Sequence, residues 1–508
     1  MHHHFSRDIS KTEAVKLPSR LYALLDHTEP TNTEPAASQE GAGPALFSFD
    51  AIDANQLDQL PSFGSDDVRV CESAWRDYWT ELSNPRRDTR NPFDRLPLYR
   101  LDTMLSPSDP MRAIAVRTEK PEDRGKWKAF HSIWLEIELL PPSPGSRPAE
   151  IYPQMFGAPI PVHIQIKLPS GRRGAALNAS FSLNSLPHVS WTVVESLVKR
   201  SAAALAVYDV GQGSASALTD KSFFPQLYFD LGCGVYRNEK TSPDSLSFCF
   251  TDKPPVLLSH WDTDHWAGAY CQSKSTHSAL KMDWVMPHQQ VSATHLAFAN
   301  DILTAGGTVQ IFDPPAGAVH STTLTDGCEL TLVRCDGSSR NDSGFAVCVS
   351  ESATSDLRWL LTGDAVYDHI LPHLSHSNTL KFQAVIVPHH GAELSHQSLI
   401  PTPLGNTPQY QRLVFSFGPN NAHGRNSTSH PKASTVDAHQ NAGWDVGRWN
   451  GITAPGHRVA KADVRATGKN GPGCERLHSI LINWKGDLVA PQTTSCGGRH
   501  CSHQLKQC

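Results

Sequence analysis

The pattern of hydrophobic and polar positions changes along the chain. Between about residues 126 and 195, apolar and polar residues alternate in short stretches separated by clusters such as PPSPGSRP. This alternation is typical of strands with one buried face, so we expect an antiparallel sheet in the form of a small β-sandwich. The predicted strands are WLEIELL at 134–140, VHIQIKL at 162–168 and ALNASFSL at 176–183.

The second half of the chain has an α/β pattern. ESLVKRSAAALA at 195–206 predicts a connecting helix, and from Leu205 onward short apolar runs end abruptly in His, Asp or Gly. Each run predicts a buried strand with polar residues at its carboxyl end, the arrangement that α/β active sites require. The runs are LAVYDVGQG, LYFDLG, PVLLSHWDTDH, DWVMPH, WLLTGD, FQAVIVPHHG and LVFSFGPNN.

The N-terminal part carries fewer signals. Residues 29–44 (EPTNTEPAASQEGAGP) lack periodicity and predict a flexible linker, whereas 65–94 predicts a helix followed by a basic loop. We therefore expect four parts along the chain. They are an N-terminal segment with its linker at 1–60, a β-rich accessory domain at 61–195, an α/β domain at 200–490 and a Cys/His-rich tail at 491–508.

Composition and charge narrow the function classes. The 508 residues are 39% hydrophobic, and 45 basic against 50 acidic residues give a net charge of -5. Proteins that bind nucleic acid over their whole surface are usually basic, so any such contact is expected to be local. The sequence predicts neither a membrane helix nor a signal peptide. The 11 cysteines then indicate reduced thiols, and we expect a cytoplasmic protein without membrane contact.

The central chemical signal is Ser259-His260-Trp261-Asp262-Thr263-Asp264-His265, directly after the strand PVLLS. In a loop that leaves a strand, the side chains of His260, Asp262, Asp264 and His265 can converge on one or two cations. Neutral imidazole and carboxylate suit Zn²⁺, Mn²⁺ or Fe²⁺. The alternative is a solvated polar turn.

Two further strand ends carry ligand types. Asp364 closes the strand of LLTGD, where a helix N-cap is the alternative, and His389 and His390 follow the strand of VIVPHHG. Adjacent histidines point in different directions, so one is expected to bind metal and the other to support it or face substrate. Three such clusters in one α/β segment are best explained by a hydrolytic site with two metals.

The order of these motifs resembles the metallo-β-lactamase fold, and more narrowly the soluble C-terminal hydrolase domain of competence DNA-uptake channel proteins. The resemblance covers about residues 200–490. It implies an αββα sandwich, here preceded by a smaller β-rich N-terminal domain. The motifs are DVGQGSA at 209–215, FDLG at 229–232, SHWDTDH at 259–265, LLTGD at 360–364, VPHHG at 387–391 and SFGPNNAHGRNSTSHP at 416–431.

The resemblance also implies a ligand set. His260 and Asp262 would bind the first metal, Asp264 and His265 the second, and Asp364 would bridge both. One of His389 and His390 would supply the late histidine ligand. The cofactors would be two divalent ions, Zn²⁺ or Mn²⁺. Most members of this fold have His where Asp262 stands, and the competence subgroup shares this departure.

Several positions would support the site. Asp209 and Gly211 of DVGQG would brace its loops from below. The usual middle histidine ligand is not evident. Asn341-Asp342-Ser343 stands in its place, so either Asp342 donates an oxygen or the first metal binds weakly.

The resemblance favours phosphodiester cleavage by a metal-bound hydroxide. We assign catalytic roles to Asp264, Asp262 and His430. His430 is a ligand, a phosphate contact or a general acid, with a capped loop histidine as the alternative. Substrate phosphate would contact a polar loop, for which an ordinary surface loop is the alternative. Its candidate residues are Asn420, Asn421, Arg425 and Ser427.

The expected function is therefore that of a metal-dependent nuclease or phosphodiesterase acting on nucleic acid or a nucleotide. Two alternatives stay open: a hydrolase of carboxylic esters, lactones or thioesters on the same fold, and a catalytically weakened binding or scaffold module. The N-terminal domain would handle substrate or a protein partner.

Overall fold

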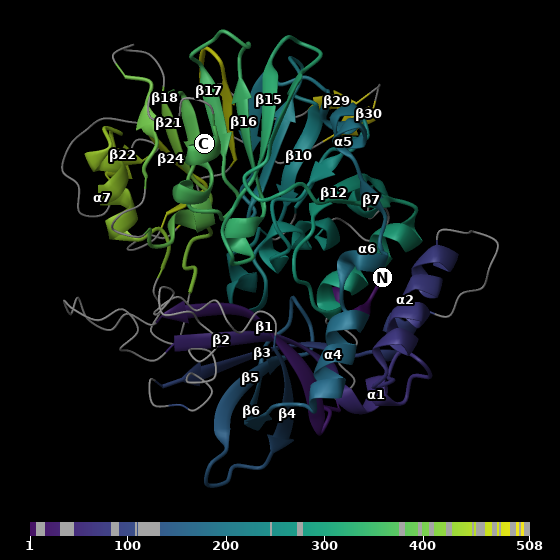
Figure 1. Ribbon diagram of the computed structural model, residues 1–508. Coiled ribbons are helices and arrows are strands. Elements are labelled where there is room, and N and C mark those ends of the chain that lie inside the picture. The colour runs from purple at the N-terminus through teal and green to yellow at the C-terminus, as the bar shows by residue number, and fades with distance from the viewer. Residues whose placement is uncertain are drawn as a thin grey trace. The chain divides into compact units, whose positions relative to one another are not determined.

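A computed structural model describes most of the chain and divides it into two compact units (Figure 1). The first unit consists chiefly of Met1–Leu186 and Gln290–Ala305, and the second begins at Pro187 and resumes at Gly306. The described residues are 1–6, 16–30, 45–82, 91–106, 109, 133–243, 246–271, 278–374, 381–394, 399–405, 411–422, 429–449, 452–453, 463–469, 475–476, 479–487, 494–496 and 499–501.

The first unit is built on a closed barrel of six antiparallel strands. Alternate residues of the strands point inward, among them Leu21, Ala23 and Leu25, and form one hydrophobic core. In barrel order the strands are β1 (Arg20–Pro30), β2 (Ala45–Asp53), β3 (Leu98–Leu105), β5 (Arg147–Tyr152), β6 (Ile160–Lys167) and β4 (Trp134–Leu140).

This barrel differs from the predicted β-sandwich. The strands expected at 134–140 and 162–168 are present, but β1 and β2 come from the region expected to be a separate N-terminal segment. Their pairing closes the sheet, since β1 bonds to both β2 and β4 and closure leaves no exposed edge. Most of the expected linker, 31–44, lies outside the described residues.

The third strand predicted in this region is wrong. Residues 176–183 fall largely in helix α4 (Gly171–Ser180), whose N-terminus is capped by the Ser170 side chain. Arg173, Ala176, Leu177 and Ser180 are buried, three or four residues apart, which is helical spacing. Short apolar stretches satisfy both periods, and here the capping serine and the helix-forming alanines favour the helix.

Three further α-helices of this unit lie among the described residues: α1 (Ala54–Asp58), α2 (Val68–Leu82) and α6 (Ala293–Ala305). α2 confirms the helix predicted within 65–94, and the basic loop expected after it lies outside the described residues. α6 was expected in the α/β domain. It joins the first unit because Ser292 donates to Asp50 of β2, and Tyr78 of α2 donates to Asn300.

The second unit contains two nine-stranded sheets. The order of the first is β28 (Gly486–Asp487), β27 (Ile480–Asn483), β8 (Ala204–Val207), β9 (Ala215–Thr219), β10 (Pro225–Leu231), β11 (Val256–Leu257), β12 (Asp283–Pro287), β13 (Thr308–Phe312) and β7 (His188–Val189). The order of the second is β14 (Val319–Thr323), β15 (Glu329–Arg334), β16 (Phe345–Ser350), β17 (Arg358–Leu361), β19 (Ala384–Ile386), β21 (Arg412–Phe415), β24 (Val464–Ala466), β22 (Arg448–Trp449) and β23 (Ile452–Thr453).

One hydrophobic core contains side chains from both sheets, such as Leu205 of β8 and Leu361 of β17. A second core, which includes Leu360 and Val436, covers the other face of β17 with helix α7 (Ala433–Asn441). Strands covered on both faces are apolar throughout rather than alternating, which explains the runs in the sequence. The α/β class expected for this part is confirmed.

The helix predicted at 195–206 is shorter and earlier. Helix α5 spans Trp191–Val198, and the apolar residues after it form the buried strand β8. Three small two-stranded pairs complete the elements: β18 (Lys381–Phe382) with β20 (Thr402–Pro403), β25 (Gly468–Lys469) with β26 (Glu475–Arg476), and β29 (Thr494–Cys496) with β30 (Arg499–Cys501).

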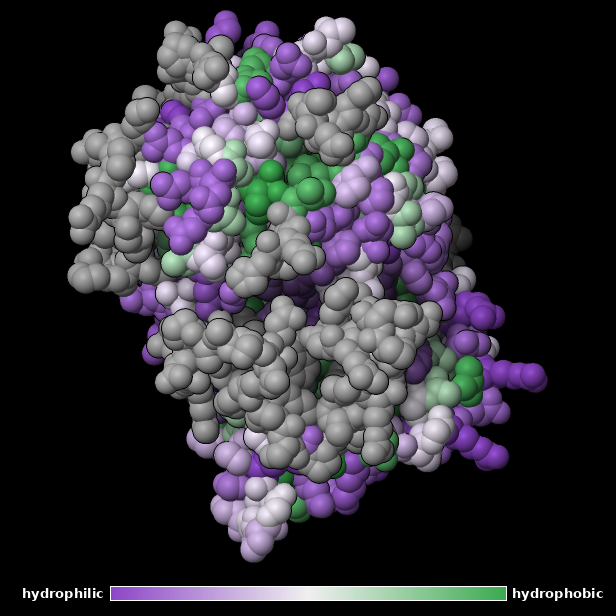
Figure 2. All heavy atoms as spheres, turned by 60° about the vertical axis from the view of Figure 1, so that its left-hand side comes forward, coloured by the Kyte–Doolittle hydropathy of each residue, from purple (hydrophilic) through white to green (hydrophobic). Residues whose placement is uncertain are grey.

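Large hydrophobic side chains are mostly buried. Where the face in Figure 2 is coloured, most residues are hydrophilic, and an apolar patch lies in its upper half. In the described parts of the chain, none of the helices has the length and apolar character needed to cross a membrane.

His439 of α7 predicts acid sensitivity. Burial lowers the pKa of His439 to about 4, and its neutral ring bonds to Tyr367 and to the Thr435 carbonyl. Unfolding restores a value near 6.5, so the unfolded state binds more protons between these pH values. The contribution of neutral His439 to the free energy of unfolding is fully present above pH 6.5, and about 3 kcal/mol of it is lost as the pH falls to 4. In urea unfolding at pH 7 and 5, His439→Gln should lose this part of the pH dependence; an unchanged slope would contradict it.

Candidate metal centre

Two tryptophans anchor the loop after β11. β11 pairs in parallel with β10 and β12, and the chain then leaves the sheet through His260 to His265. The Trp261 indole donates to the Pro287 carbonyl, and the Trp266 indole donates to the Trp261 carbonyl. Because both rings are buried, they anchor the loop and leave its His and Asp side chains to face one region.

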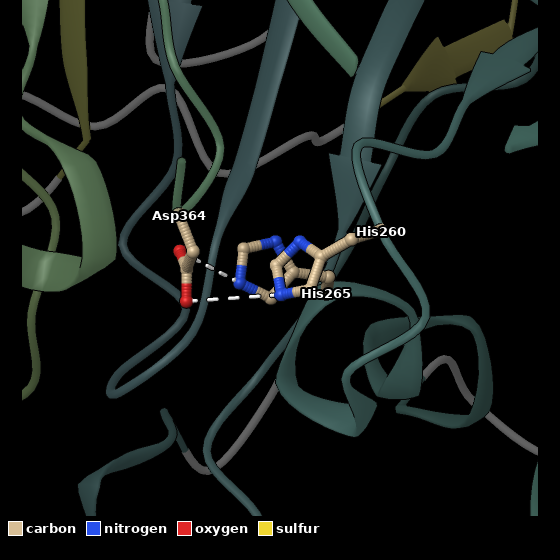
Figure 3. A group of neighbouring side chains, drawn as sticks. All are labelled: His260, His265 and Asp364. Atoms are coloured by element: carbon tan, nitrogen blue, oxygen red, sulfur yellow. Dashed lines mark ion pairs between the residues drawn. The ribbon is translucent and has the colours of Figure 1, made fainter. Parts of the chain in front are cut away.

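His265 is oriented by Asp230. Its Nδ1 lies 2.8 Å from Asp230 Oδ2, and Asp230 Oδ1 accepts the Ser259 backbone N–H at 2.7 Å. A carboxylate that accepts from Nδ1 leaves the Nε2 lone pair available to a cation. The Nε2 of His265 points to Asp364 Oδ1 at 3.0 Å (Figure 3).

His260 faces the same carboxylate, and its ring lies beside that of His265 (Figure 3). Its Nδ1 lies 3.0 Å from Ser259 Oγ, and its Nε2 lies 3.8 Å from Asp364 Oδ2. The rings of His260 and His265 are 4.0 Å apart. Three buried side chains, two from the loop after β11 and one from the end of β17, thus bring nitrogen and oxygen atoms together.

The donor atoms of this group fit a metal ion. His260 Nε2, His265 Nε2 and Asp364 Oδ1 are all buried, and the last two face each other at 3.0 Å. Polar atoms gathered in a buried site are costly to desolvate, and a bound cation would satisfy all three. His260, His265 and Asp364 therefore form one group of potential ligands.

A second group shares His265 and adds Asp264 and His390. The Nδ1 of His390 lies 2.8 Å from the Ser416 carbonyl oxygen, which directs its Nε2 to Asp264 Oδ2 at 3.1 Å. His389 and His390 both have positive φ, 48° and 56°. This tight turn points their rings in different directions, so His390 joins the ligand group.

His389 lies outside both groups. Its Nε2 is 3.8 Å from Asp364 Oδ2, and its side chain is 25% exposed. Its Nδ1 lies 3.5 Å from the Asn341 side-chain nitrogen. Of the two adjacent histidines, His389 is therefore the one that stays outside the ligand groups.

The electrostatics of the cluster couple metal binding to the loss of a proton. Burial alone would lower the pKa of His265, but Asp364 and Asp230 raise it well above its usual value. Burial would raise the pKa of Asp364, yet His265 and His389 hold it well below its usual range. Without metal, His265 is therefore a cation paired with carboxylates, and metal binding must displace its proton.

Asp262, expected as a metal and catalytic residue, is in neither ligand group. Its Oδ1 accepts from the Nε of buried Arg340, and its Oδ2 lies 3.4 Å from His260 Nε2. The sequence analysis gave no role in the site to Arg340 or to Asp230. Asp230 could have been found, because it stands at the end of the strand LYFD, and the same signal marked Asp364.

The residues expected to support the site bond mainly to nearby backbone groups. Asp209 accepts the Gly211 N–H, and Gly211 has a φ of 77°. A side chain there would strike the Thr241 carbonyl oxygen. Asp342 accepts from Ser339 and from the Val366 N–H, two residues after Asp364. Because both of its oxygens are engaged, Asp342 acts as a brace rather than as a ligand.

The predicted phosphate loop is described only in part. Asn421 accepts from the His430 N–H and donates to the carbonyls of His430 and Gly418, so it ties the loop together. The buried His430 ring lies 5.7 Å from that of His389. Asn420 has a φ of 57°. Arg425 and Ser427 lie outside the described residues, as does the tail at 491–508 except for β29 and β30.

The first unit has a third group of ligand types, Asp26, Asp50 and His295. Arg100 pairs with both carboxylates there. His295 Nδ1 accepts the Ser292 backbone N–H at 2.9 Å, so that lone pair is already used. This group is a buried salt-bridge network that holds α6 on the barrel.

Replacing Asp230 with asparagine is expected to lower metal affinity about ten- to hundredfold, because a neutral amide no longer fixes the His265 tautomer. Calorimetric titration of metal-free protein with Zn²⁺ measures this. Asp336→Asn is the matched control, since Asp336 pairs with His369 and His373 of the same unit outside the cluster. Equal affinities for wild type and Asp230→Asn would contradict the orienting role.

Comparison with known proteins adds no relative: no protein-family model matches the chain, and a search of curated proteins found no match.

Proposed function

We propose that the second unit is a metal-dependent hydrolase that cleaves phosphodiester bonds in nucleic acid or a nucleotide, on a metallo-β-lactamase fold. The observation that carries the proposal is the group of buried donor atoms that His260, His265 and Asp364 bring together after β11 and β17. The hydrophobic core shared by two sheets supports the fold. The motif set that resembles the competence hydrolases supports the substrate class.

The ligand roles follow from the contacts. Asp264, His265 and His390 would hold one ion, and His260 with Asp364, which also faces His265, begins a second position. A divalent cation held by these residues, Zn²⁺ or Mn²⁺ by the donor types, would supply an activated water and offset charge on a phosphoryl oxygen.

Two histidines of this chain are candidates for proton transfer to the leaving group. His389 is partly exposed beside Asp364, and His430 lies next to it. Asp262 is a poor proton donor because Arg340 stabilises its charged form.

Hydrolysis by metal-free and Mn²⁺- or Zn²⁺-loaded protein tests the proposal. We expect metal-dependent cleavage of bis(4-nitrophenyl) phosphate and of single- or double-stranded DNA or RNA, lost in Asp264→Ala and retained in Asp336→Asn. Cleavage of 4-nitrophenyl acetate or a lactone without phosphodiester cleavage would favour the carboxylic ester hydrolase instead.

One observation favours the binding-module alternative. The Arg340–Asp262 pair removes a carboxylate from the first metal position, which would weaken catalysis. A folded protein that neither binds metal nor cleaves any of these substrates would support a scaffold. A cytoplasmic location and a partner or substrate contact through the barrel unit remain part of the proposal.

A further inference from the structure

Arg340 and Asp262 are held against each other because Gln289 bonds to the backbone next to both. The side chains of Arg340 and Asp262 are 7% and 12% exposed. The Gln289 amide donates to the Arg340 carbonyl at 2.6 Å and accepts the Trp261 N–H at 3.3 Å. Gln289 therefore links the backbone beside Asp262 to the backbone of Arg340, and the guanidinium is held against the carboxylate.

A cation at the first position would lie beside this guanidinium. At that position His260 Nε2 lies 3.4 Å from Asp262 Oδ2 and 3.8 Å from Asp364 Oδ2, while Arg340 holds the other oxygen of Asp262. Like charges a few ångströms apart in a buried site repel strongly. Arg340 also neutralises the charge of Asp262 that would attract an ion.

The second position has no such competitor. Among the described residues, the ion pairs of Asp264 and Asp364 are with histidines only. His265 belongs to both ligand groups, but its Nδ1 is taken by Asp230, so only Nε2 remains for one ion. The donors therefore favour one tightly bound ion.

We propose that Arg340 sets the metal number of this centre: its guanidinium supplies the positive charge at the first position, so that one ion binds tightly and a second only weakly. The inference rests on the metal site of the proposed function but not on the reaction. Arg340 is a positioning residue, since it acts through Asp262.

Titration of metal-free protein with Mn²⁺ tests the inference. Wild type should show one tight and one weak site. Arg340→Met, which removes the charge and keeps the length, should tighten the weak site by more than about tenfold. Arg340→Lys keeps a charge and should stay near wild type. A merely structural arginine would not produce a gain in affinity.

Two controls and one replacement variant make the result decisive. Arg334→Met removes another buried arginine of the unit, whose guanidinium donates to the His288 carbonyl, and should leave both affinities unchanged. Arg340→Met in an Asp262→Ala background should add little, because the carboxylate through which it acts is gone. If Arg340→Met fails to fold, Arg340→Gln replaces it with the same expectation.

Unchanged or weaker binding at the second equivalent in folded Arg340→Met would overturn the inference, as would two tight sites in wild type. Two tight sites would still agree with the proposed function. A protein that binds metal as described but cleaves no phosphodiester would refute the proposed function and leave the role of Arg340 standing.

Discussion

Replacing Asp364 with alanine is expected to abolish tight metal binding and lower metal-dependent hydrolysis by at least about a thousandfold. Asp364 is 4% exposed, and its two oxygens face His265, His260 and His389. Without it, the histidines would have to hold a divalent ion without the central negative charge. Calorimetric titration and a phosphodiester assay on the same preparation measure both effects.

The Asp364→Ala result requires a folded variant. Asp364 pairs with a charged His265 when no metal is present, so circular dichroism and thermal unfolding must accompany the assay. Asp336→Asn breaks two comparable Asp–His pairs in the same unit and should keep both properties. Activity of Asp364→Ala within tenfold of wild type would place the reaction elsewhere.

The two adjacent histidines are expected to separate metal binding from turnover. His390→Ala should weaken the tight ion by at least about a hundredfold, because its Nε2 faces Asp264 in the ligand group. His389→Ala should keep that ion within about threefold but lower kcat by about a hundred- to thousandfold, as loss of a proton-transfer group does.

Metal affinity and kcat at saturating metal, measured for both variants, give the comparison. The pH profile adds an independent readout, since loss of a general acid should remove one limb of the kcat profile in His389→Ala. If His389→Ala lost the ion and His390→Ala kept it, the assignment of ligand and substrate-facing histidine would be reversed.

The site was largely predictable because its ligands follow local rules. A buried strand can be predicted from a few apolar residues in a row. The residues that follow such runs include His260, Asp264, His265 and Asp364. Which of His389 and His390 faces the group was not predictable. It depends on two successive left-handed residues and on the distant Ser416 carbonyl.

The pairing of Asp262 with Arg340 could not be predicted from the sequence, for a similar reason. Arg340 lies 78 residues from Asp262, and the two meet only because Gln289 joins their loops. No local pattern distinguishes a carboxylate that binds metal from one that binds arginine. The observed pairing moves Asp262 from the expected ligands to a neighbouring role.

The first unit shows how far its fold could be predicted from the sequence. Barrel closure depends on Leu21 meeting Ile137 across the β1–β4 pair, a contact between segments more than a hundred residues apart. Alternation predicts strands but not the order in which they pair. The helix at 171–180 was missed because eight residues of ALNASFSL fit both periods.

The metal content of protein purified without added metal, measured by elemental analysis for wild type and Asp364→Ala, tests the central claim most directly. We expect about one Zn²⁺ or Mn²⁺ ion per wild-type chain and none in the variant. Wild type and variant that are equally well folded and equally free of metal, even after incubation with both ions, would contradict the account.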